Sequence, residues 1–164
     1  MGVELNPVTS GPVVNESLET NIPGVFACGN VLHVHDLVDY VSEEAENAGK
    51  NAAAYVKGIR NETEKDPVAI RCEGGVRYTV PSLVRVAYMQ EEQTIRFRVG
   101  DVYQNACLTV RFNDEIVMKI NKRVMAPGEM EQIKLKKSKL EEFEGLREIT
   151  VCVEGEEPKQ QTSR

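Results

Sequence analysis

The chain has 164 residues, a hydrophobic share of 41%, a charged share of 28% and a net charge of −6, which are values of an ordinary folded protein with one or two domains. It has no run of about 18 apolar residues and no basic and apolar start typical of a secretion signal, so we expect a cytoplasmic protein without a membrane span. The net charge is −7 over residues 1–67 and +1 over residues 68–155, so neither part has the strongly basic character of a nucleic-acid-binding domain.

Closely spaced proline and glycine residues predict irregular or extended structure over residues 1–24. The apolar run from Val25 to Cys28 then predicts a short buried strand, which stops abruptly at Gly29 and Asn30. In an α/β protein such a strand ends beside a ligand. Glycine lets the backbone approach closely, and a short polar side chain after it can hold a hydroxyl group.

The next predicted element is a helix from Asp36 to Gly58. Its apolar side chains recur at three- and four-residue steps and predict one buried stripe, made of Leu37, Val41, Ala45, Ala48, Ala52 and Tyr55 or Val56. Asp36 is the predicted N-cap, and Gly58 is the predicted left-handed residue that ends the helix. The acidic residues Glu43, Glu44 and Glu46 are interpreted as a solvated face near the positive helix end.

Residues 61–67 are predicted to be a solvated linker, after which the hydrophobic period changes to two. Strand candidates follow at short spacing around residues 76–80, 84–88, 95–99, 108–112, 116–120, 133–135 and 149–153, and residues 137–143 can add a turn or two of helix. This pattern predicts an antiparallel, immunoglobulin-like β-sandwich over residues 68–155, followed by a disordered tail over residues 156–164. The expected fold class is therefore α+β.

A resemblance to a known family covers residues 1–58. It rests on the order Thr20, Pro23-Gly24-Val25-Phe26-Ala27-Cys28-Gly29-Asn30, followed by a helix with Ala48-Gly49 and Ala52-Ala53. This order resembles the C-terminal FAD-contacting motif of FAD/NAD(P)-dependent oxidoreductases of the pyridine nucleotide-disulfide oxidoreductase type. The resemblance implies that residues 1–60 are the last strand and helix of an FAD-binding domain. The parent enzyme would pass hydride from NAD(P)H through FAD to an unknown acceptor.

The resemblance also implies the cofactor contacts. Gly29 and Asn30 would face FAD, although the family usually has Asp at the second position, where it binds a ribityl hydroxyl. The backbone N–H groups of Tyr40, Val41 and Ser42 would stabilise negative charge on the reduced flavin ring. Because the chain has no glycine-rich pyrophosphate loop and no NAD(P)H site, we interpret it as an inactive fragment that retains no FAD alone. Its partner would be the missing N-terminal FAD- and NAD(P)-binding portion.

The two histidines are candidates for chemistry near the flavin. His33 and His35 alternate around Val34, and the pKa of imidazole suits proton transfer. Alternate histidines can also ligate one metal ion, but no third ligand is evident in the sequence, so no metal is expected. The four cysteines lack a C-x-x-C spacing and are expected to be reduced thiols.

Alternatives remain open at three points. The chain can instead be a non-catalytic β-sandwich that serves as an interaction or assembly module. The arginines at positions 77, 85, 96, 98 and 111 form either the solvated side of a sheet, which we prefer, or a face that docks the acidic first segment. The helix stripe must be covered, either by the sandwich or by a second copy in a homodimer.

Overall fold

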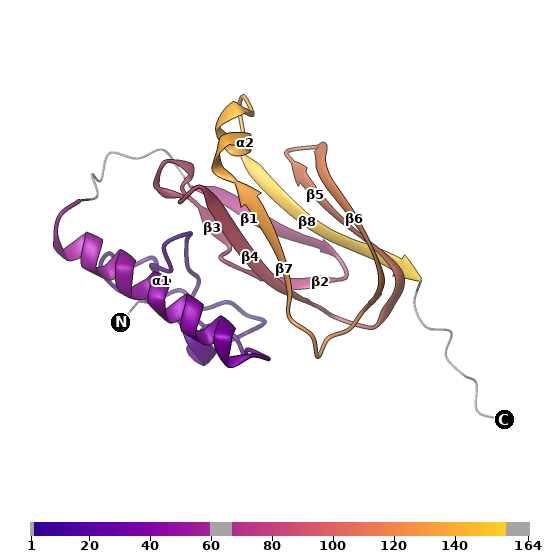
Figure 1. Ribbon diagram of the computed structural model, residues 1–164, viewed down its shortest axis with the longest axis horizontal. Coiled ribbons are helices and arrows are strands. Elements are labelled where there is room, and N and C mark those ends of the chain that lie inside the picture. Colours follow the sequence, from indigo (N-terminus) through magenta and orange to yellow (C-terminus); the bar gives the residue numbers. More distant parts are fainter. Residues whose placement is uncertain (1, 60–66, 157–164) are drawn as a thin grey trace.

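In a computed structural model, the chain is described over residues 2–59 and 67–156. The α+β class is confirmed: N-terminal loops and one long helix precede two β-sheets (Figure 1). In chain order the elements are η1 (Gly29–Val31), α1 (Val38–Val56), β1 (Val68–Gly74), β2 (Val76–Val80), β3 (Leu83–Val84), η2 (Val86–Tyr88), β4 (Glu92–Val99), β5 (Tyr103–Phe112), β6 (Glu115–Met125), β7 (Glu131–Lys136), α2 (Lys137–Glu142) and β8 (Glu148–Glu156).

The strands form a five-stranded sheet with the order β3-β1-β8-β5-β6 and a three-stranded sheet with the order β2-β4-β7. All pairs are antiparallel except β1 and β8, which run parallel with Ile70 opposite Ile149. The expectation of a purely antiparallel sandwich is therefore wrong for this pair. A parallel pair needs a long connection, and here the whole remainder of the sandwich lies between the two strands.

One apolar core joins the two sheets. Ile95, Phe97 and Val99 on β4 are fully buried and belong to the same cluster as Leu108 on β5 and Val151 on β8. Their alternation along each strand places these side chains on the inner faces, as two packed sheets require. Helix α2 buries Leu140 in this core and lies at one end of the sheets in Figure 1.

Six of the seven predicted strands are confirmed, as β2 and β4 to β8, and the short helix predicted at residues 137–143 is confirmed as α2. The strand predicted at residues 84–88 is wrong, because the extended chain ends at Val84 and a 3-10 turn follows. Strand β1 was not predicted, although Val68, Ile70 and Cys72 alternate along it. The predicted linker and tail lie outside the described residues, apart from Pro67 and Glu156.

Helix α1 begins two residues later and ends two residues earlier than the predicted span. Leu37 takes the N-cap position and offers no side-chain hydrogen bond, so the predicted N-cap role of Asp36 is wrong. The Asp36 carboxylate instead contacts the Arg98 guanidinium and accepts a hydrogen bond from the Met130 N–H. Gly58 has a φ of +64°, which confirms the left-handed end of the helix.

The predicted apolar stripe of α1 is buried only in part: Ala48 is buried, and Val41 and Ala52 are half-buried. Only Glu44 and Ala48 are fully buried on this helix. Leu37 and Val56, which belong to the predicted stripe, are 52% and 84% exposed. Glu44 was interpreted as part of a solvated face, and that interpretation is wrong. Residue 44 lies three positions after Val41 and four before Ala48, so it shares their side of the helix.

The strand predicted at residues 25–28 is also wrong. This segment makes one isolated bridge, between Glu19 and Phe26. Two further backbone bonds fold it against the preceding residues, from Thr20 N–H to the Val25 carbonyl and from Ala27 N–H to the Leu18 carbonyl. A strand needs a continuous neighbour to pair its backbone groups, and no such neighbour lies beside it among the described residues.

The acidic first segment docks on the sandwich through arginines. For three of them the preferred interpretation, a solvated side of the sheet, is therefore wrong, and the docking interpretation applies. Arg85 forms an ion pair with Glu16, Arg96 with Glu43, and Arg98 with Asp36. A second, smaller apolar cluster supports these pairs by joining Val14, Leu18, Leu32 and Ala48 to Tyr78 and Val80 of β2. Within this chain the helix therefore lies to one side of the two-sheet domain, as Figure 1 shows.

Candidate functional site

A tight turn at Gly29 organises the loop before α1. Gly29 has a φ of +71°, which favours glycine, and its carbonyl accepts hydrogen bonds from the N–H groups of Leu32 and His33 at 2.9 and 3.4 Å. The turn buries Leu32 and His33, whereas Val31 and Val34 are 61% and 66% exposed. Both His33 and His35 consequently direct their imidazoles into the protein.

The imidazoles meet the carboxylate of Glu44. His33 Nε2 lies 3.2 Å from Glu44 Oε2, and His35 Nε2 lies 3.3 Å from Oε1. The three side chains are only 0%, 1% and 2% exposed. The Gly29 N–H also donates to Glu44 Oε1 at 2.6 Å. We call His33, His35 and Glu44 the buried His–Glu cluster.

The electrostatics of the cluster follow from this geometry. Burial favours the neutral acid of Glu44, but the hydrogen bonds from His33 and the Gly29 N–H and the nearby imidazoles outweigh burial and lower the pKa of Glu44. Burial lowers the pKa of His35, although the Glu44 carboxylate opposes that shift. Burial and the Glu44 charge together raise the pKa of Cys28. The fold therefore stabilises the charged carboxylate of Glu44 although this side chain is buried.

Arg96 on β4 connects the cluster to the sandwich. Its Nη1 lies 3.9 Å from Glu44 Oε2, and its Nη2 contacts Glu43 at 2.5 Å. Its guanidinium stacks over the ring of Tyr40, 5.0 Å from the centroid. Arg96 therefore places positive charge beside Glu44 while Glu43 and Tyr40 hold its guanidinium.

The resemblance-implied cofactor residues lie close together at the start of α1. A side-chain atom at Gly29 would lie 3.5 Å from Val41 Cγ1, so this glycine and the first turns of α1 are in contact distance. Asn30 is exposed, and its Oδ1 accepts a hydrogen bond from the His35 N–H at 3.3 Å. Ser42 is exposed and Tyr40 is half-buried under Arg96. The structure thus brings these five residues into one region.

Helix α1 leaves its first backbone N–H groups without a side-chain cap. The first four N–H groups of a helix have no acceptor within it. The helix begins at Val38, so Tyr40 belongs to this first turn, but its N–H donates to the Leu37 carbonyl at 3.2 Å. The N–H groups of Val41 and Ser42 belong to the following turn, so the three N–H groups that the resemblance implies are not the free ones of this helix start. Four exposed apolar side chains flank this helix start: Val31, Val34, Leu37 and Val38.

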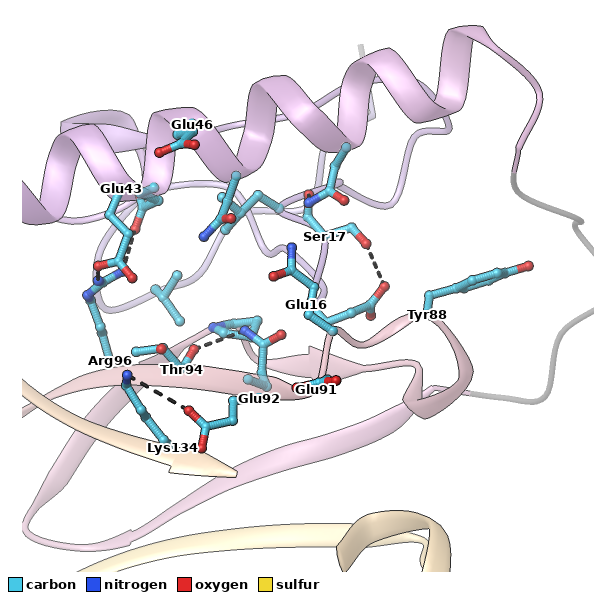
Figure 2. Close-up of a pocket in the computed structure, with 18 residues that line it drawn as sticks. Glu16, Ser17, Glu43, Glu46, Tyr88, Glu91, Glu92, Thr94, Arg96 and Lys134 are labelled. Carbon is cyan, nitrogen blue, oxygen red and sulfur yellow. Dashed lines mark hydrogen bonds and ion pairs between the residues drawn. The ribbon is translucent and has the colours of Figure 1, made fainter. Parts of the chain in front are cut away.

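A cavity of about 570 Å³ lies between α1, residues 16–18 and strand β4 of the small sheet, and Lys134 of β7 also belongs to its lining (Figure 2). Glutamates dominate its lining, at positions 16, 43, 44, 46, 91 and 92, and Arg96 and Lys134 are its basic groups. Figure 2 shows Glu43 reaching from α1 to Arg96 and Lys134 lying beside Glu92. An acidic lining repels a diphosphate, so this cavity does not suit FAD.

The fit to FAD is therefore limited to one surface. The start of α1, with uncapped N–H groups and apolar neighbours, has the chemistry to contact a flavin ring. It forms an open surface, whereas cofactor sites enclose most of their ligand. The candidate proton-transfer groups His33 and His35 point at Glu44, and their side chains are buried. A second protein surface is needed to complete a flavin site here.

Glu44 and Arg96 are the two residues that sequence reasoning did not place in the site. The signal for Glu44 was its spacing to Val41 and Ala48, which gives all three the same side of the helix. Nothing in the local sequence distinguishes Arg96 from the other arginines of the strands, because its partners lie more than 50 positions earlier. Only the docking of α1 on β4 brings it to Glu44.

No helix in the described part of the chain has the length and apolar character needed to cross a membrane. Comparison with known proteins adds no family: no protein-family model, no curated protein and no solved structure matches this chain.

Proposed function

We propose that this chain is the flavin-facing C-terminal part of an FAD/NAD(P)-dependent oxidoreductase. In this proposal, residues 20–42 supply one wall of the flavin site, and the β-sandwich anchors that wall. FAD would supply hydride acceptance and transfer when bound. The chain's own contribution is to position the flavin, with Gly29 allowing close approach and the start of α1 offering N–H groups toward developing negative charge.

The observation that carries the proposal is the uncapped, apolar start of α1 directly after the motif-bearing turn. Leu37 and Val38 are 52% and 79% exposed there, although a helix start in water commonly carries a Ser, Thr, Asp or Asn cap. An apolar and uncapped helix start is chemically suited to a flat, partly apolar ring with an electron-rich edge. Asn30 can offer its amide to a ribityl hydroxyl once its bond to the His35 N–H is exchanged.

A second observation supports a covering polypeptide. Among the described residues, ten exposed large apolar side chains precede the predicted linker and three follow it. The three that follow are Ile116, Ile120 and Val124 on β6. Contiguous exposed apolar patches mark surfaces that bind another protein, and the proposal expects these side chains to be covered in the parent enzyme. The FAD- and NAD(P)-binding portion implied by the resemblance would provide that surface.

We also infer that the two-sheet domain is immunoglobulin-like. Strands β2, β4 and β7 follow one another across one sheet, while β5, β6 and β8 share the other. Crossings from one sheet to the other, such as β4 to β5 and β6 to β7, are typical of the Greek-key connections of such sandwiches. The parallel β1 beside β8 is a departure from this pattern. A non-catalytic assembly module remains the alternative function of such a domain.

The test is to isolate the protein natively from its source cells with an antibody against the sandwich. The proposal expects bound FAD, released by heating, together with a polypeptide region that carries a glycine-rich dinucleotide fingerprint. In that form, Gly29→Val is expected to lower the FAD content, because its φ of +71° disfavours a branched side chain. Gly128→Ala is the matched control, since it has open space around it.

Two outcomes oppose the proposal. A colourless native preparation without FAD or a fingerprint-bearing region would favour the assembly module. FAD content that is equal in the Gly29→Val and Gly128→Ala proteins would show that the turn does not face the flavin.

A further inference from the structure

We propose that the buried His–Glu cluster binds a divalent transition-metal ion such as Zn²⁺. The cluster offers two imidazole nitrogens and a carboxylate, and one donor atom from each residue lies within 4.8 Å of the others. The sequence offered only the His-x-His pair. The fold supplies the third ligand by placing Glu44 of α1 against both rings.

The donor atoms lie close to the separations of a coordination sphere, and the side chains have to move inward to reach them. Ligand bonds of about 2.0–2.1 Å around a tetrahedral zinc ion place neighbouring donor atoms about 3.3 Å apart. The two Nε2–Oε distances in the cluster are 3.2 and 3.3 Å, each to a different oxygen of Glu44, and one donor atom from each residue lies within 4.8 Å of the others. An ion could therefore replace the shared protons with small movements of three side chains.

The charge and chemical nature of the donors select the class of ion. One carboxylate with two neutral imidazoles carries a single negative charge. Arg96, 3.9 Å from Glu44 Oε2, opposes a cation here, although Glu43 pairs with its guanidinium. The Gly29 N–H that donates to Oε1 orients the carboxylate from the second shell. Two histidines and one carboxylate suit zinc and the neighbouring divalent metals, whereas Ca²⁺ and Mg²⁺ prefer oxygen ligands. Such a set leaves at least one coordination position for an exogenous ligand.

Internal hydrogen bonds leave the two rings incompletely satisfied. Each imidazole uses Nε2 on Glu44, and both Nδ1 atoms are buried without a hydrogen-bond partner among the described residues. Buried polar atoms are normally paired, so the bonds to Glu44 by themselves do not satisfy either ring. In the metal-bound form Nε2 would bind the ion and the ring proton would move to Nδ1, where it requires an acceptor such as a water molecule.

Access to the cluster is through the surface loop that carries it. Val34, between the two histidines, is 66% exposed, and Asn30 at the start of the loop is exposed too. A local opening of the loop would therefore admit an ion to side chains that are themselves buried. This inference does not depend on the proposed flavin function, because all three ligands belong to the described residues of this chain.

The experiment uses the full chain without a histidine tag, freed of metal by a chelator and titrated with Zn²⁺ or Co²⁺ by calorimetry. We expect one ion per chain and an upward shift of the melting temperature, because a ligand that binds the folded state stabilises it. His33→Gln, His35→Gln and Glu44→Gln are each expected to weaken binding by roughly 100-fold or more, given that even second-shell changes cost 10–100-fold. Glu46→Gln, an exposed glutamate on the same helix, is the matched control and is expected to bind as the unchanged chain does.

A second measurement on the unchanged chain guards against variants that do not fold. The chain has two histidines, so nitrogen NMR of the imidazoles reports on the cluster alone. Zn²⁺ is expected to shift the Nε2 signals of both rings. Absence of a one-to-one complex, Nε2 signals unmoved by Zn²⁺, or a folded Glu44→Gln variant that binds as tightly as the unchanged chain would each overturn the proposal.

Discussion

Replacing Glu16 with Ala should release the N-terminal segment from the sandwich without unfolding the sandwich. The Glu16 carboxylate is 1% exposed and contacts the Arg85 guanidinium at 3.0 Å. It also accepts hydrogen bonds from the Arg85 backbone N–H and the Ser17 hydroxyl, both at 2.8 Å. The substitution removes all of these contacts and leaves Arg85, whose side chain is 21% exposed, with Glu19 at 3.4 Å.

The expected magnitude follows from the burial of the pair. Removing one partner of a buried ion pair costs about 3–5 kcal/mol, and the partial exposure of Arg85 favours the lower end of that range. A loss of about 3 kcal/mol lowers the ratio of docked to undocked segment by roughly 100-fold. The sandwich has its own apolar core, so its stability should be nearly unchanged.

Hydrogen exchange measured by mass spectrometry separates the two effects. Protection of the α1 amides should fall by roughly the factor given above, while the amides of β5 and β8 keep theirs. Glu46→Ala is the control, since that side chain is 66% exposed and pairs with Lys50 of its own helix. In the Glu16→Ala/Arg85→Ala double variant, part of the loss should be recovered because no buried charge remains unpaired. Unchanged protection of α1 in Glu16→Ala, or an equal loss in β5 and β8, would refute this reasoning.

Two further predictions concern packing and thiol chemistry. Gly11→Ala should loosen the N-terminal segment in the same exchange experiment, because the added carbon would lie 2.2 Å from the Leu32 carbonyl oxygen. Gly128→Ala is the control and should have no effect, because its added carbon has no atom within 4 Å. Equal exchange in the two variants would contradict the steric clash expected at Gly11. Cys72 should react slowly with thiol reagents at neutral pH, because burial raises its pKa and keeps the thiol protonated. Rapid labelling of Cys72 in the folded chain, detected by mass spectrometry of the peptides, would contradict that expectation.

Local patterns in the sequence were sufficient for most of the secondary structure. Period-two alternation identified the strands from β2 onward, with the exception of β3, because each inner-facing residue must be apolar. Three- and four-residue spacing identified α1, and the left-handed Gly58 ended it as expected. The alternation of Val68, Ile70 and Cys72 was present for β1 as well, so that strand was available to the same reasoning.

Those local patterns could not predict which residues and strands contact one another in the fold. Whether the arginines of the strands face water or the acidic first segment depends on where that segment docks, and Arg96 and Glu43 are separated by 53 positions. The parallel pairing of β1 with β8 joins the two ends of the sandwich and leaves no local trace. The strand expected at residues 25–28 failed for a related reason, because extended structure requires a neighbour that local sequence cannot guarantee.

The buried His–Glu cluster shows the same division within one site. The sequence alone determined that two imidazoles stand at alternate positions in a loop before a helix. Tertiary structure decided that the loop turns inward at Gly29 and that Glu44 enters the protein to meet both rings. A glutamate on an amphipathic helix is ordinarily solvated, because burial of an unpaired carboxylate is costly. Only the convergence of the Gly29 N–H, two imidazoles and Arg96 makes its burial favourable.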